Sequence, residues 1–288
     1  MKQIRKAVIP AAGFGTRFLP FTKAVPKEML PIVDIPTIEY IVQEAIDSGI
    51  EEVLIIINSE KECIRTHFGH NQVLEKFLLS KNKTKELEIV QALPKKIKVE
   101  FTYQEEQLGL GHAVLCAEKF AANEPFVLLL GDDVYVGNHA PATKQLMCAY
   151  EKTGSTILGT LEVPNEDVSK YGICKPLAGA KGNLVELESV VEKPSIDEAP
   201  SNLAIGGRYI LTPAIFDFLK NQTRGAGGEI QLTDSILRLM SKEKVYSLAI
   251  DGKRYDIGSK KGFLEATVDF SLARQDLKDA MQEILDKH

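Results

Sequence analysis

The stretch "AVIPAAGFGTRFLP", residues 7–20, joins a short apolar run to a loop rich in glycine. Residues 7–9 have the apolar character of a strand that is buried on both faces. Gly13 and Gly15 follow at once, where the chain of an α/β protein leaves its sheet and binds ligands. We therefore expect a sheet of buried strands whose first loop forms part of a ligand site.

The same kind of apolar run recurs through the first half of the chain. "VLIII" at 53–57 and "FVLLL" at 126–130 alternate with helical patterns, of which the one near 36–48 is the clearest. Strand-rich sequence follows from 155 to 211, and a long helix is expected from 263 to 286. This order predicts an α/β protein with a mixed, mostly parallel sheet flanked by helices and a β-rich second part.

The composition argues against several classes of function. The formal net charge of -5 disfavours a nucleic-acid surface, and the longest apolar runs are too short to cross a bilayer. The segment 59–96 is polar and helical in pattern, so we expect a solvated insert there. The cysteines form no CxxC pair, which favours a reduced, cytoplasmic protein with thiols in its core; they are Cys63, Cys116, Cys148 and Cys174.

The residues of the first loop exclude two common nucleotide motifs. The dinucleotide fingerprint needs a third glycine where Phe18 stands, and a P-loop also needs a glycine there. The loop continues to residue 31 with Arg17, Lys23 and Lys27 against one acid, Glu28. Each cation alone has the alternative of a solvated surface charge. Three of them in a loop rich in glycine and proline favour phosphate binding, because backbone N–H groups can approach an anion there.

An acidic pair follows the apolar run at 126–130. Asp132 and Asp133 lie where open α/β sheets bind ligands, at the carboxyl end of a strand. Mg²⁺ needs one or two carboxylates and completes its shell with water and phosphate oxygens. A simple β-turn is the alternative, since Gly-Asp-Asp is also turn sequence. Position favours the metal role.

A series of longer motifs runs along nearly the whole chain. "GFGTRFLPFTKAVPKEMLP" is followed in order by "QLGLGHAVLCA", "LLLGDD", "YGI", "VEKP", "AIGGRYIL", "GGEIQLTDSI" and "YDIGSKKGFLEA". This series resembles the signature of the sugar-1-phosphate nucleotidylyltransferases, and most of all their bacterial branch that uses UTP and glucose 1-phosphate. The resemblance implies a Rossmann-like nucleotidyltransferase fold, a Mg²⁺ cofactor, and a reaction that gives UDP-glucose and pyrophosphate.

The resemblance also implies how the chain is divided. Residues 1–288 would form one nucleotidyltransferase domain, with a nucleotide-binding part at about 1–150 and a sugar-binding part at about 151–262. Residues 263–288 would form a C-terminal helix that packs on the body or on another subunit. We expect a homo-oligomer, a dimer or a tetramer, with no nucleic-acid or membrane partner.

The family pattern assigns most of the nucleotide site to the first loop and to a second glycine segment. Arg17 and Lys27 are implied to lie against the triphosphate and to act in catalysis. Gln104 suits a pyrimidine edge because its amide offers a donor and an acceptor, although an exposed strand end is the alternative reading. The nucleotide-binding residues implied by the resemblance are Ala11, Ala12, Gly13, Gly15, Thr16, Arg17, Lys27, Gln104, Gly109, Gly111 and Asp132.

The metal and the sugar phosphate are assigned to other segments of the chain. Asp132 and, less directly, Asp256 are implied as metal ligands, with Asp133 as an alternative. The motif "VEKP" implies Glu192 for sugar hydroxyls and Lys193 for the sugar phosphate, where it acts in catalysis. Strand alternation would send these neighbours to opposite faces, but a turn at the end of the strand can present both. Gly172 and Gly207 are implied to approach the sugar, with turn or bulge glycines as the alternative.

Three other functions remain open on the residues alone. A thymidylyltransferase that uses dTTP shares the Gly-x-Gly-Thr-Arg and Glu-Lys-Pro elements. A metal-dependent glycosyltransferase would use paired acids but would consume UDP-glucose. A non-catalytic sensor of nucleotide sugars would keep the pocket without turnover. The sequence contains no arrangement typical of a Ser or Cys nucleophile, and an anionic sugar phosphate needs none.

Overall fold

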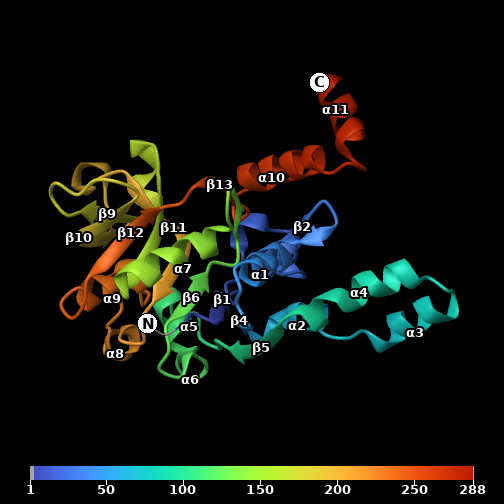
Figure 1. The fold of residues 1–288 in the computed structure, drawn as a ribbon, viewed down its shortest axis with the longest axis horizontal. Coiled ribbons are helices and arrows are strands. Elements are labelled where there is room, and N and C mark those ends of the chain that lie inside the picture. The colour runs from blue at the N-terminus through green and yellow to red at the C-terminus, as the bar shows by residue number, and fades with distance from the viewer. Residues whose placement is uncertain (1–2, 288) are drawn as a thin grey trace.

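The computed structural model describes residues 3–287 and is built around one large sheet (Figure 1). Its strands are β1 (Lys6–Pro10), β2 (Pro31–Ile32), β3 (Ile35–Pro36), β4 (Glu52–Ile57), β5 (Lys98–Tyr103), β6 (Phe126–Leu129), β7 (Asp133–Gly137), β8 (Thr156–Glu162), β9 (Gly172–Pro176), β10 (Leu184–Glu192), β11 (Leu203–Leu211), β12 (Val245–Ala249) and β13 (Gly252–Asp256). Its α-helices are α1 (Thr37–Asp47), α2 (Glu62–Phe68), α3 (Gln72–Ser80), α4 (Thr84–Lys96), α5 (Leu110–Leu115), α6 (Glu118–Ala121), α7 (Ala142–Thr153), α8 (Ile215–Lys220), α9 (Leu232–Leu239), α10 (Lys260–Ala273) and α11 (Lys278–Asp286).

The large sheet is mixed. Within the described residues it contains nine strands in the order β5-β4-β1-β6-β11-β8-β12-β10-β9. Strands β5, β4, β1 and β6 all pair in parallel, whereas β11 runs antiparallel to both β6 and β8. Among the described residues this sheet has four parallel and five antiparallel strand pairings, so parallel pairing predominates only among β5, β4, β1 and β6.

The strands have apolar residues at consecutive positions because a hydrophobic core covers each face of the sheet. In β1, Ile9 belongs to one buried cluster and Val8 to the other, and in β4 the same alternation separates Ile55 from Ile56. Neighbouring side chains of a strand point to opposite faces, so a strand covered on both sides must be apolar at every position. The predicted buried strands at the start of the chain are confirmed.

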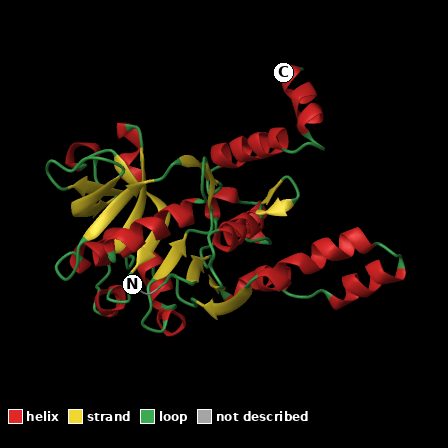
Figure 2. Cartoon of the chain, viewed as in Figure 1, coloured by secondary structure: helices red, strands yellow, loops and turns green. Residues whose placement is uncertain are grey.

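The predicted helical insert is confirmed, and it forms an arm. Helices α3 and α4 pack against each other and project from the body beyond α2 (Figures 1 and 2). Exposed apolar side chains occur on this arm, among them Val73, Phe77 and Ile89. No helix in the described part of the chain is both long and apolar enough to cross a bilayer.

The predicted single helix over 263–286 is wrong. The chain instead forms α10 and α11, because Arg274 leaves the helical region with φ -87° and ψ 127°. The guanidinium of Arg274 pairs with Asp34 and with Asp276, and these contacts hold the chain at the break. Hydrophobic spacing continues across the break, which is why the sequence pattern alone did not reveal it.

The expectation that the cysteines lie in the core is also wrong in part. Cys174 is buried and Cys116 is half-buried, but Cys63 and Cys148 are exposed. Cys148 lies on α7, whose neighbouring residues Met147 and Ala149 face the core. A helix places consecutive residues about 100° apart, so the residue between two core-facing positions can point to solvent.

Candidate active site

The carboxyl ends of β1 and β6 meet at one edge of the sheet, because these strands are parallel neighbours. The first loop and the acidic segment therefore lie together. A Cβ on Gly131 would lie 2.9 Å from the carbonyl oxygen of Pro10, so the two chains approach too closely there for a side chain. The structure thus brings together two segments that are about 120 residues apart in sequence.

The first loop forms short 3-10 turns rather than a long helix. Gly15 has a φ of 66°, in the left-handed region, and its carbonyl oxygen accepts a hydrogen bond of 2.8 Å from the Thr22 hydroxyl. Phe18, which stands where a dinucleotide fold needs glycine, packs edge-on against Phe263 of α10 at 6.0 Å between ring centroids. The first loop therefore packs against α10 through Phe18. A dinucleotide-binding fold would have glycine at this position.

Lys27 and Asp132 form an ion pair at the edge of the sheet. Burial alone would lower the pKa of Lys27, but the carboxylates of Asp132, Glu28 and Asp133 together raise it. Burial alone would raise the pKa of Asp132, but Lys27, Arg254 and Arg17 together lower it. Both side chains are thus held in their charged forms. A cavity of about 220 Å³ lies against this pair and is lined by Gly15, Thr16, Arg17, Phe18, Lys27, Asp132 and Gly258.

Two carboxylates suited to a divalent cation face the same glycine. A Cβ on Gly258 would lie 2.7 Å from Asp132 Oδ2 and 3.0 Å from Asp256 Oδ1. The backbone fixes this approach, because the N–H of Ile257 donates a hydrogen bond of 2.8 Å to the carbonyl oxygen of Asp132. Mg²⁺ is commonly held by one or two carboxylates together with water and phosphate oxygens. The donor set fits such an ion, and no group of three or more acidic, His or Cys ligands occurs among the described residues.

The neighbouring residue Asp133 is buried and pairs with a different cation. Its Oδ1 lies 2.6 Å from the Arg254 guanidinium, and Asp133 pairs with Asp256 in the register of β7 and β13. Burial raises the pKa of Asp133 to about 6 although Arg254 opposes the shift. A Cβ on Gly207, whose φ is 77°, would lie 2.1 Å from Asp133 Oδ2. Asp133 therefore supports the segment from within, and Gly207 makes room for it.

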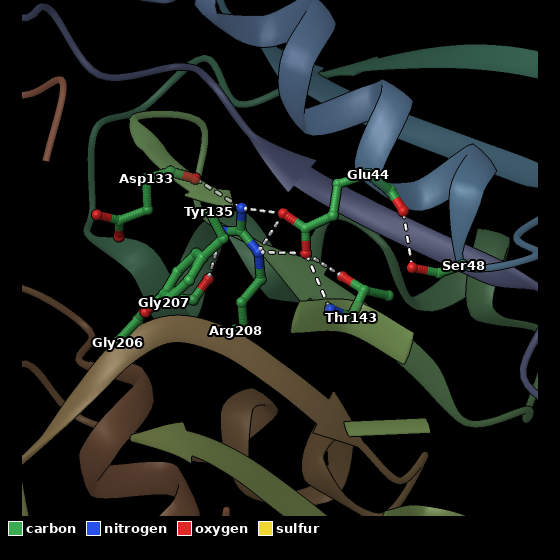
Figure 3. Close-up of polar contacts among 8 residues, drawn as sticks. All are labelled: Glu44, Ser48, Asp133, Tyr135, Thr143, Gly206, Gly207 and Arg208. Atoms are coloured by element: carbon green, nitrogen blue, oxygen red, sulfur yellow. Dashed lines mark hydrogen bonds and ion pairs between the residues drawn. The ribbon is translucent and has the colours of Figure 1, made fainter. Parts of the chain in front are cut away.

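A buried ion pair anchors the same segment (Figure 3). Arg208 of β11 donates to both carboxylate oxygens of Glu44 on α1, with the shortest contact at 2.7 Å. The same guanidinium donates to the carbonyl oxygen of Asp133 at 2.6 Å and to that of Gly207 at 3.2 Å. Glu44 also accepts from the N–H and the hydroxyl of Thr143 on α7. Three elements and the acidic segment are thus joined through one carboxylate and one guanidinium.

A second cavity at this edge has a volume of about 770 Å³. Both signs of charge occur on its wall. The cations are Arg17, Lys170, Arg254 and Lys261, and the acids are Asp132, Asp133, Asp167, Asp256 and Glu265. Tyr171 lines it as well, and its ring lies 5.4 Å from the Arg254 guanidinium. A polar cavity of this size can hold an extended polar ligand, and its cations can pair with anionic groups of that ligand.

The second glycine segment lies at the end of β5. Gln104 is buried, and its side-chain Nε2 donates to the carbonyl oxygen of Gly109 at 3.1 Å. The N–H of Gly111 donates to the carbonyl oxygen of Ile230 at 2.8 Å. Cβ atoms on Gly109 and Gly111 would both lie within 3 Å of the 229–230 segment. These glycines are needed for chain packing, and the N–H of Gly111 is already used.

Three of the four sugar-side residues of the sequence analysis lie together, whereas Gly207 lies against Asp133. Gly172 and Glu192 are paired in the register of β9 and β10, and Glu192 Oε2 accepts a hydrogen bond of 2.6 Å from the hydroxyl of Thr233. Lys193 follows the strand with a φ of 47°, so its Nζ comes within 3.5 Å of Glu192 Oε1. The turn expected after this strand is therefore present, and it presents both side chains. This group does not line the large cavity, but the carbonyl oxygen of Tyr171 accepts from the Lys193 N–H.

Several residues around the site were not identified from the sequence. Arg254, Arg208 and Glu44 hold the acidic segment, and Thr233 contacts Glu192. Arg254 stands two residues before Asp256, and side chains two apart share one face of a strand, so this signal was available. Arg208 and Glu44 gave no such signal, since they lie 164 residues apart.

Comparisons with known proteins identify the family of the chain. The family model described as "Nucleotidyl transferase" matches residues 6–271. A UTP–glucose-1-phosphate uridylyltransferase of Staphylococcus epidermidis is 50% identical over 288 residues, covering 99% of each chain. The Bacillus subtilis protein of the same name is 49% identical over 281 residues, covering 98% of this chain and 96% of the other.

A solved structure of similar fold also matches nearly the whole chain. A structure described as UTP-bound UGPase from Acinetobacter baumannii is 36% identical, has a TM-score of 0.90, and covers 98% of this chain and 99% of the other. The match of the family model spans the first loop, both acidic segments and the sugar-side strands. The chain belongs to the nucleotidyl transferase family.

Proposed function

We propose that this chain transfers the uridylyl group of UTP to α-D-glucose 1-phosphate and forms UDP-glucose and pyrophosphate. The observation that carries the proposal is the meeting of Lys27 with Asp132 beside Arg17, at the mouth of a polar cavity. Relatives that carry the name of this activity are about half identical to the chain over nearly its whole length.

The proposed reaction needs charge neutralisation more than proton transfer. The phosphate of a sugar phosphate has a second pKa near 6, so its attacking oxygen is already anionic at neutral pH. The barrier comes from bringing that anion to the α-phosphorus of a triphosphate. Arg17 and Lys27 would offset the charge of the triphosphate and hold it for in-line attack. Asp132 and Asp256 would hold Mg²⁺, which supplies further positive charge when bound.

The remaining residues would select the two substrates. Backbone around Ala11, Ala12 and Gly13 would bind uracil, with the Gln104 side chain as a second contact. Nε2 of Gln104 is held by Gly109, which leaves its Oε1 as the atom to accept from the uracil N3–H. Glu192 would accept from sugar hydroxyls, while the half-exposed Lys193 would reach the sugar phosphate.

We further propose how the parts of the chain divide this work. The parallel strands of residues 1–150 would form a Rossmann-like nucleotide-binding part, residues 151–262 the sugar-binding part, and residues 263–288 a packing segment. The exposed apolar residues Leu264, Ile284 and Leu285 on α10 and α11 support a homo-oligomeric contact there. A cytoplasmic location follows from the substrates proposed.

The direct test supplies the protein with Mg²⁺, a panel of sugar 1-phosphates and each nucleoside triphosphate, and measures pyrophosphate release. We expect release with UTP and glucose 1-phosphate. Preference for dTTP would identify a thymidylyltransferase instead. Consumption of UDP-glucose without added pyrophosphate would identify a glycosyltransferase, and nucleotide binding without turnover would identify a sensor.

The metal role is tested with Asp132→Asn. This change removes the carboxylate that faces Gly258, and we expect kcat to fall about 10²–10³-fold and to respond little to added Mg²⁺. Asp167→Asn is the matched control, because Asp167 lines the same cavity but pairs with Lys170. Unchanged Mg²⁺ dependence in Asp132→Asn would move the metal to Asp133 or Asp256.

A further inference from the structure

Two buried side chains hold the back of the nucleotide loop. Asn58 and Lys61 follow β4 and are each 5% exposed. Lys61 Nζ donates to the carbonyl oxygen of Ala11 at 2.6 Å, and Asn58 Nδ2 donates to that of Ala12 at 2.6 Å. Both carbonyl groups are thus tied to the body of the protein by side chains that no motif singled out.

Glu28 completes this arrangement from the loop itself. Its Oε2 lies 2.8 Å from Lys61 Nζ, and the carboxylate is buried. Burial lowers the pKa of Lys61 while the Glu28 carboxylate opposes that change. Since an unpaired buried charge is costly, Glu28 keeps the ammonium group at the Ala11 carbonyl.

Fixing these carbonyl groups also fixes two N–H groups. In a trans peptide the C=O and the N–H of the next residue point in opposite directions. With the carbonyl groups of Ala11 and Ala12 turned toward Lys61 and Asn58, the N–H groups of Ala12 and Gly13 point away from them. Neither N–H donates to a protein acceptor among the described residues, whereas the N–H of Ala11 donates to Ile56.

We propose that Asn58 and Lys61 are positioning residues that set base selectivity, by holding the N–H groups of Ala12 and Gly13 as donors toward the base. This inference rests on the proposed function, since it takes the base to be uracil. Uracil presents a carbonyl oxygen at position 4, where cytosine presents an amino group. A backbone N–H held in place can donate a hydrogen bond to the uracil oxygen. Against cytosine, the backbone N–H would face the amino group, which is also a donor, and neither group would find an acceptor.

The main variant is Asn58→Asp, assayed at pH 8. It keeps the oxygen that accepts from the Glu60 N–H at 3.0 Å, and it replaces only the donor that faces Ala12. We expect the ratio of kcat/KM for UTP to that for CTP to fall by about ten-fold or more. The KM for glucose 1-phosphate should stay within about two-fold, because the sugar side is separate from this loop.

A second variant removes the other contact without leaving a buried charge. The double change Glu28→Leu with Lys61→Met eliminates both members of the pair, and we expect the same loss of selectivity. Thr156→Val is the matched control, since it removes a buried hydroxyl that donates to Glu243 at 2.7 Å at another place in the sheet. Its free energy of unfolding in urea should fall comparably while its UTP preference is kept.

The outcomes separate this inference from the proposed function. An active wild type with unchanged UTP preference in both loop variants overturns the inference alone. The inference is also overturned if Thr156→Val loses its preference for UTP over CTP, because general destabilisation then explains the effect. If the wild type forms no UDP-glucose, the proposed function fails, and calorimetric binding of UTP and CTP still tests the selectivity of the loop.

Discussion

Two ion pairs flank the acidic segment, and they differ in burial. The side chains of Lys27 and Asp132 are 22% and 24% exposed, whereas those of Arg208 and Glu44 are 0% and 6% exposed. The first pair lies against a cavity, and the second joins β11 to α1 beneath the segment. The difference indicates that the first can exchange its partner for a ligand and that the second cannot.

Physical chemistry supports this division. A partly exposed ion pair keeps part of its hydration, so each partner can exchange the other for a new charge at a smaller cost than in a fully buried pair. A buried pair has lost its hydration, and removal of one partner leaves an uncompensated charge. Lys27 is therefore accessible to a ligand in the cavity, and Arg208 holds the segment that contains Asp132 and Asp133.

Breaking the buried pair should have the largest effect. Arg208→Met leaves the Glu44 carboxylate buried without its cation, so we expect the free energy of unfolding to fall by about 3–5 kcal/mol. Urea denaturation monitored by circular dichroism measures this change. The double variant with Glu44→Leu should lose less than the single variant, and an equal or larger loss would show that the pair is not the cause.

Breaking the accessible pair should affect turnover instead. Lys27→Ala is expected to lower kcat by about 10²–10³-fold, because a positioned cation near the triphosphate is lost. The free energy of unfolding should fall by less than in Arg208→Met, because the side chains of Lys27 and Asp132 remain partly exposed. Lys6→Ala is the control, since Lys6 pairs at 3.3 Å with Glu124, away from this edge of the sheet. Steady-state kinetics on both variants decide the matter, and normal turnover in Lys27→Ala would refute the assignment.

The buried Asp133 carboxyl group should make the stability of the protein depend on pH. Its pKa in the folded state is about 6 against an ordinary value of 3.8. Between those values the folded chain keeps a proton that the unfolded chain has released, so stability falls as pH rises through this window. The loss amounts to as much as about 3 kcal/mol, since each pKa unit corresponds to roughly 1.4 kcal/mol.

Asp133→Asn tests this contribution directly. The variant cannot titrate at this position, so its free energy of unfolding should depend less steeply on pH between about 4 and 6 than that of the wild type. Urea midpoints across that range provide the measurement. Identical pH profiles would mean that another carboxyl group carries the proton.

Much of the fold could be predicted because it is encoded locally. The apolar runs of β1, β4 and β6 predicted buried parallel strands, since only a sheet covered on both faces needs continuous apolar residues. The place of Asp132 at the carboxyl end of β6 followed from the same pattern, because open α/β sheets bind ligands at that end of their strands. The break at Arg274 was missed, because hydrophobic spacing does not report ion pairs with a distant residue such as Asp34.

The sequence by itself determined which residues bring charge to the site and which glycines give its first loop backbone flexibility. Composition and position indicated the basic first loop and the acidic pair at 132–133, and the resemblance to a known family selected Arg17, Lys27 and Asp132 among them. The exclusion of a dinucleotide fold needed only Phe18. The tertiary structure decided which charges face a cavity and which are buried beneath it. Lys27 and Arg208 are both cations in the sequence, but burial, a property of packing between distant segments, gives them different chemistry.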